Sequence, residues 1–160
     1  FALWENISYV LMYGLGTAPK RQHARLLLAL CLTACFACGC GEAVGPERFY
    51  AENREALENA VYKIMANGNV DGVQIQGVER ISYWESENPT IEFIISTSGS
   101  VPACTYKGIY YSASGEPAAF QCADVALTET ETGWAWAAEG DNRGTTVHIE
   151  GNWFAFEAAL

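Results

Sequence analysis

The spacing of apolar and polar residues after residue 45 predicts one helix followed by strands. In PERFYAENREALENAVYKIMANG, residues 46–68, apolar side chains recur at helical intervals and share one face. They are Phe49, Ala56, Leu57, Ala60, Val61 and Ile64. Pro46 suits the first turn of a helix, and Asn67-Gly68 is a typical stop signal. The pattern therefore predicts an amphipathic helix over this segment.

After Gly72 the apolar residues alternate with a period of two, which is typical of strands. Gly77 interrupts the first run as a bend or bulge, and ASGEPAAFQ, residues 113–121, is an irregular connection. The predicted strands cover residues 72–84, 91–95, 104–112, 133–139, 145–150 and 153–157. The expected fold class is α+β, with the helix packed on an antiparallel sheet of about five or six strands.

The segment before this domain has the directional pattern of a signal peptide. Basic residues Lys20, Arg21 and Arg25 precede the apolar run LLLALCLTA, residues 26–34. That run suits a signal-peptide core of about 7–15 residues and is too short for a spanning helix of about 20. We expect residues 1–11 to lie outside the fold, 12–34 to be a helical signal peptide, 35–45 a tether and 46–160 one domain.

The end of the signal, Leu32-Thr33-Ala34-Cys35, resembles the lipobox of bacterial lipoproteins. The resemblance implies that the Cys35 thiol receives a diacylglycerol and that Cys35 becomes the N-terminus. Lipid anchoring to the cell membrane on its extracytoplasmic side follows as the expected location. The alternative is ordinary signal cleavage, for instance after Ala43, which gives a secreted protein.

The cysteines favour export over metal binding. Cys35, Cys38 and Cys40 form C-x2-C-x-C without a neighbouring histidine or a second pair, whereas structural zinc requires four ligands. Outside the cytoplasm thiols oxidise, so we expect a disulfide between Cys104 and Cys122, worth about 3 kcal/mol for such a loop. Cys38 and Cys40 remain as tether thiols.

The charge of the exported part limits its partners. After Cys35 the chain carries six basic and 18 acidic side chains, a net charge of −12. Nucleic-acid binding needs a basic surface and is not expected. Electrostatic adhesion to anionic lipid is also disfavoured, so membrane attachment falls to the lipid at Cys35.

Few residues are suited to catalysis. His148 is the one histidine after Cys35, and the alternation around it places it on the solvent side of its strand. A nucleophilic pair would require Cys104 or Cys122 beside it, which the expected disulfide opposes. No common catalytic or nucleotide-binding motif is present. We therefore expect no enzyme activity, no metal and no cofactor.

Two groups of carboxylates have a structural explanation. Glu139, Asp141 and Glu150 bracket the loop GDNRG, whose residue types are those of a hairpin turn and do not match a calcium loop. Glu129 and Glu131 in TETET point to one strand face, where like charges discourage edge pairing.

Aromatic residues exceed what one small core needs, so an exposed aromatic patch that binds protein or carbohydrate is the favoured function. The candidates are Trp84, Tyr111, Trp134, Trp136 and Trp153. The alternative is a secreted inhibitor or immunity-type protein that acts on another protein. A hydrolase is the third and least favoured class.

Two resemblances extend this interpretation. Residues 104–157, with YYSASGEPAAFQ and GWAWAAEGDNRGTTVHIEGNWFAFE, resemble small lipoproteins of Firmicutes, which implies a cell-envelope location and no assigned activity. A helix followed by an antiparallel sheet is similar to the cystatin fold, and VQIQG, residues 73–77, lies near the position of the cystatin Q-x-V-x-G hairpin. Val73 replaces the motif's glutamine, so only the fold analogy is retained.

Overall fold

The computed structural model describes residues 45–160, which begin with the helix α3 (Pro46–Asn67). Pro46 occupies its first turn, and Gly68 ends it in the left-handed region, with φ of 68° and its N–H bonded to the Ile64 carbonyl at 2.8 Å. The helix therefore begins and ends where the sequence predicts. Within the described residues, no helix is both long and apolar enough to cross a membrane.

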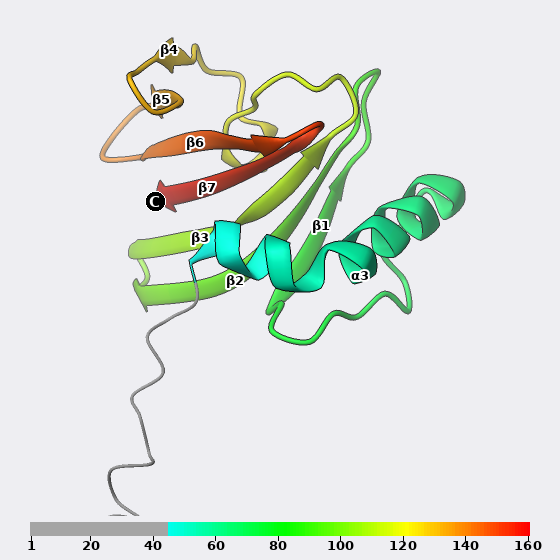
Figure 1. Cartoon of the computed structure of the whole chain (residues 1–160). Coiled ribbons are helices and arrows are strands. Elements are labelled where there is room, and N and C mark those ends of the chain that lie inside the picture. Colours follow the sequence, from blue (N-terminus) through cyan, green and yellow to red (C-terminus); the bar gives the residue numbers. More distant parts are fainter. Residues whose placement is uncertain (1–44) are drawn as a thin grey trace, which may run out of the picture. The chain divides into compact units, whose positions relative to one another are not determined.

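In the described part of the chain, seven antiparallel strands form one sheet in the order β1-β2-β3-β7-β6-β5-β4, which confirms the α+β class (Figure 1). The two-residue strand β4 raises the number above the five or six expected. The strands are β1 (Arg80–Trp84), β2 (Thr90–Ser100), β3 (Ala103–Ser112), β4 (Thr128–Glu129), β5 (Trp134–Ala137), β6 (Arg143–Glu150) and β7 (Trp153–Ala159).

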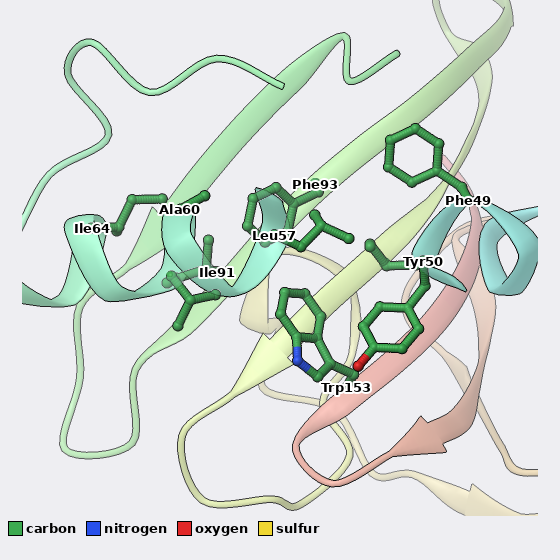
Figure 2. Packing of buried hydrophobic residues seen from close by; sticks show 10 residues of the cluster. Phe49, Tyr50, Leu57, Ala60, Ile64, Ile91, Phe93 and Trp153 are labelled. Carbon is green, nitrogen blue, oxygen red and sulfur yellow. The ribbon is translucent and has the colours of Figure 1, made fainter. Parts of the chain in front are cut away.

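The helix packs on one face of the sheet and closes the first core. Leu57 and Ile64 point from α3 toward Phe93 and Ile91 of β2, and all four are fully or almost fully buried (Figure 2). Trp153 of β7 lies beside Phe93, with ring centroids 5.7 Å apart. The amphipathic pattern of the helix thus identifies five of its six buried residues, whereas Ala56, also predicted on that face, is exposed and Tyr50 was not predicted.

A second core fills the opposite face of the sheet. Phe120 belongs to the connection between β3 and β4, which folds back over the sheet and stacks its ring on Phe156 at 5.1 Å. Tyr110 stacks on Phe154 at 5.0 Å on the same face. The sheet is therefore covered on both sides, although α3 is the one α-helix of residues 45–160.

The first predicted strand is shorter than its alternation suggested. Residues 72–79 form turns rather than strand, and β1 begins at Arg80. Gly72 and Gly77 adopt φ values of 72° and 84°, which glycine tolerates without steric cost. Val73 packs against the first core from this loop, so its apolar character reflects burial and not strand pairing.

Candidate binding site

A hollow of about 320 Å³ opens between the loop that follows α3 and the start of β1. Its size lies at the lower end of the range of about 300–1,000 Å³ found for ligand pockets. Five of the eight residues around it are apolar and three are polar, and the surface that they expose to the hollow is more polar than apolar. The eight residues are Val70, Val73, Gln74, Ile75, Val78, Glu79, Arg80 and Ile81.

The loop that lines the hollow is held by its own turns. The Val73 N–H donates to the Val70 carbonyl and the Val78 N–H donates to the Ile75 carbonyl, each at 3.1 Å. Gly77 turns the chain over the Phe49 ring, where a Cβ atom would approach the ring to 2.9 Å. One wall of the hollow is therefore a loop held in place by turns, and this loop does not form a strand.

The strand beside the hollow lies at the edge of the sheet. Among the described strands β1 pairs with β2 alone, from Arg80 opposite Ile94 to Trp84 opposite Thr90. Every second residue of an edge strand presents an unpaired N–H and C=O, and this edge can accept a further strand. Ile81 belongs both to β1 and to the lining of the hollow, so the edge and the hollow adjoin.

Large apolar side chains are strongly exposed at two other places in residues 45–160. Tyr62 and Met65, with exposed fractions of 76% and 39%, lie on the last two turns of α3. Val101, with an exposed fraction of 88%, stands at the turn between β2 and β3. Isolated apolar residues are common on protein surfaces, so these carry less weight than the hollow.

The five aromatic residues predicted to bind a ligand do not gather on one exposed surface. Trp153 is buried in the first core, where Tyr111 packs edge-on against it with a centroid distance of 5.5 Å. Trp136 is buried in the second core, on the other face of the sheet. These three rings stabilise the two cores.

The remaining two aromatic candidates are partly buried on the face opposite the helix. Trp134 packs edge-on against Phe154 at 6.2 Å. Trp84 donates its indole N–H to the Glu92 carboxylate at 2.9 Å. Each ring therefore already has a partner within the fold, which leaves little free aromatic surface.

Glu92 is a buried carboxylate that the alternation of its strand does not reveal. Its side chain is almost fully buried, and it accepts the Trp84 indole N–H and the Gln121 backbone N–H at 2.5 Å. Burial raises the pKa of Glu92, although both hydrogen bonds and the charge of Arg80 oppose the shift. All its close partners belong to the fold, so Glu92 is a structural carboxylate.

Glu92 also secures a strained turn in the connection between β3 and β4. Gln121 and Cys122 have φ values of 59° and 50°, in the left-handed region that non-glycine residues avoid. Such conformations cost about 1–3 kcal/mol each and need support from their surroundings. The hydrogen bond from Gln121 to Glu92 supplies that support and fixes the connection to β2.

The predicted disulfide between Cys104 and Cys122 is wrong, because both cysteines are free. Cys104 lies opposite Gly99 at one end of β3. The Cys122 thiol bonds to Thr90, which pairs with Ser112 at the other end. At about 3.3 Å per residue the two ends of β3 lie roughly 26 Å apart, and a disulfide needs Cα atoms within about 7 Å.

The Cys122 thiol is not an activated nucleophile. Partial burial raises its pKa, and the nearby Glu92 charge acts in the same direction, although the bond to Thr90 opposes it. Reactive cysteines instead have a depressed pKa in an electropositive environment. His148 is exposed, with its Nε2 atom 2.9 Å from the Gly151 carbonyl oxygen, and offers no base to this thiol.

The carboxylates noted in the sequence do not assemble into a ligand site. Ala138 and Asn142 close the turn that contains Glu139 and Asp141 by a backbone hydrogen bond of 2.8 Å. Glu150 lies elsewhere and accepts the Tyr50 hydroxyl at 2.7 Å. Glu129 lies in β4, while Glu131 lies in the turn before β5. In residues 45–160, no group of three metal-binding side chains is close enough to hold an ion.

The predicted lipid site at Cys35 and the tether thiols Cys38 and Cys40 lie outside the described residues, as does the signal peptide. Comparisons with protein-family models, with curated proteins and with solved structures give no match for this chain. The candidate function is therefore inferred from the chain's own residues.

Proposed function

We propose that the protein is an exported binding module, anchored to the extracytoplasmic side of the cell membrane by lipid at Cys35. The basic flank, the apolar run of residues 26–34 and the L-T-A-C motif support export and anchoring. The acidic character of the domain that follows makes lipidation the better explanation for membrane attachment. Release after ordinary signal cleavage is the alternative.

The single observation that carries the binding function is the hollow beside the edge strand β1. It combines apolar residues, including Ile75 and Ile81, with polar groups and with a free strand edge. Apolar side chains together with a few placed polar groups are typical of binding sites. The residues that line the hollow do not include a nucleophilic side chain with a general base beside it, which favours binding over catalysis.

The second candidate function is an inhibitor or immunity-type protein that acts through the turn between β2 and β3. One observation favours it: Val101 is 88% exposed at this turn, next to Pro102. An apolar residue at the end of a hairpin is suited to entering a cleft of another protein. This turn offers one exposed large apolar side chain, whereas the hollow offers five apolar residues beside a free strand edge, so the turn ranks second.

Mass analysis of the intact protein from native membranes tests the anchoring. We expect a chain that begins at a diacylated Cys35, both in the wild type and in Cys38→Ser, which is the matched control. Cys35→Ser should leave the signal segment uncleaved, because the lipid acceptor thiol is missing. An unmodified wild-type chain beginning near Val44 would contradict lipidation and favour secretion.

A further inference from the structure

The free edge of β1 and the adjoining hollow together specify the chemistry of a ligand. We propose that an extended, basic segment of a partner protein adds to β1 as an eighth strand and places an apolar side chain in the hollow. The proposal rests on the binding function proposed above and names the class of its partner. It follows from three features of this edge: its backbone, its hollow and its charge.

The free backbone groups of β1 favour a ligand whose own main chain is extended. The row of unpaired N–H and C=O groups along an edge strand is complementary to another strand and to few other ligands. The loop of residues 68–79 makes its internal backbone hydrogen bonds between Val70 and Val73 and between Ile75 and Val78. It therefore lines the hollow without pairing with β1.

The apolar residues of the hollow pack against the first core, and they favour an apolar side chain on the added strand. Side chains of a strand alternate between its two faces, so an added strand directs every second residue to one side of the sheet. Ile81 lines the hollow from β1 and also packs against the first core, which marks the side that α3 covers. An apolar residue on this side of the added strand would extend that core.

The acidic residues around β1 favour basic residues in the ligand. Glu79 precedes β1, and Glu85 and Glu87 follow it, all three exposed. The one basic residue of the strand, Arg80, contributes to the lining of the hollow, but its guanidinium lies over the Tyr106 ring on the other face of the sheet, 5.7 Å from the ring centre. Such an edge attracts cationic segments and speeds their association.

The same charges disfavour a second copy of this chain as the occupant. A symmetric antiparallel pairing of two β1 strands about Ser82 brings Glu79, just before the strand, to the same end of the pair as Glu85 of the other copy. Like charges that are brought together in this way repel one another and weaken the pairing. A heterologous basic segment meets the same positions with opposite charge.

Binding of synthetic peptides to the detergent-extracted, lipid-anchored chain tests the proposal. The probe is (Lys-Val)4, and its comparisons are (Glu-Val)4 and (Lys-Val)4 with N-methyl groups on alternate amides. We expect (Lys-Val)4 to bind at least about tenfold more tightly than either comparison, because each lacks one required feature. Hydrogen exchange should slow at β1 amides and not at the β2–β3 turn.

Charge reversal at the edge provides a variant that leaves the core intact. Glu79→Lys combined with Glu85→Lys should exchange the preference for the basic peptide with one for the acidic peptide. Glu139→Lys is the matched control, because Glu139 is exposed in the turn between β5 and β6, at the other side of the sheet order.

Four results would overturn the proposal. The first three are equal binding of the N-methylated peptide, no binding of (Lys-Val)4, and self-association through β1 that the peptide does not disturb. Protection confined to residues 97–103 would also overturn it, while leaving a binding role at the β2–β3 turn. None of these results bears on anchoring, which the mass of the Cys35 N-terminus decides separately.

Discussion

At the scale of one residue, Glu92 shows that alternation along a strand does not determine whether a side chain is buried. In IEFII, residues 91–95, Ile91 and Phe93 share one face, and Glu92 falls on the other, where a polar side chain suggests solvent. In the structure that other face is covered, and Glu92 is buried with Trp84 and Gln121 as hydrogen-bond donors. Period-two alternation assigns residues to faces, but it does not say whether a face is covered.

The buried carboxylate gives the folded chain a specific dependence on pH. Because burial raises the pKa of Glu92 above its ordinary value of 4.5, the folded state holds this proton to a higher pH than the unfolded state does. The resulting stabilisation is fully present below about pH 4.5 and is lost as the pH rises through the raised pKa. Glu92→Gln has no proton to release in this range.

We therefore expect the free energy of unfolding of the wild type, relative to Glu92→Gln, to fall as the pH rises from about 4. The total change should be about 1.4 kcal/mol for each unit by which the fold raises this pKa. Urea unfolding at several pH values from 4 to 8 measures it, with the exposed Glu139→Gln as the charge-loss control. If the free energy of unfolding of the wild type instead rose with pH relative to that of Glu92→Gln, a raised pKa of Glu92 would be contradicted.

At the scale of elements, α3 was predictable because its sequence carries period, start and stop signals together. The buried residues of α3 include Leu57, Ala60, Val61 and Ile64, which the periodicity had placed on one face. Residues 72–79 were not predictable in the same way, since valines and isoleucines at alternate positions also suit turns that pack on a core. The connection that carries Phe120 has no periodicity, so its role as a cover was missed.

The packing of α3 on the sheet should depend strongly on Leu57, whose side chain is fully buried on the face of the helix that contacts the sheet. Leu57→Ala removes most of a core side chain and leaves a cavity, so we expect the free energy of unfolding to fall by about 2–5 kcal/mol. Urea denaturation followed by far-ultraviolet circular dichroism measures the change. Glu55→Ala, on the exposed side of the same helix, should change it by less than about 0.5 kcal/mol.

At the scale of the whole molecule, the structure explains why the chain contains so many aromatic residues. Their number exceeded the needs of one core, and this surplus suggested an exposed binding patch. The structure uses the surplus for a second core, where Tyr110, Phe120, Phe154 and Phe156 are buried on the face without a helix. The candidate site instead depends on an edge and a loop, whose proximity arises only when the chain folds.

Both cores share β2, so the domain should unfold as one unit. Ile91 belongs to the first core and Ile94 to the second, and both are almost fully buried on opposite faces of this strand. We expect Ile91→Val and Ile94→Val each to lower the free energy of unfolding by about 0.5–1.5 kcal/mol. Because the two side chains have separate neighbours, the double variant should show the sum within about 0.5 kcal/mol.

The two variants also test cooperativity, because tryptophan fluorescence gives the second core more weight than circular dichroism does. Of the four tryptophans in residues 45–160, Trp134 and Trp136 belong to the second core and Trp84 lies on the same face of the sheet, while circular dichroism reports the helix and the sheet together. If the shared sheet couples the cores, each variant shifts both signals to the same new urea midpoint. Separate midpoints in Ile94→Val would instead mean that the cover formed by the β3–β4 connection opens before α3 leaves the sheet.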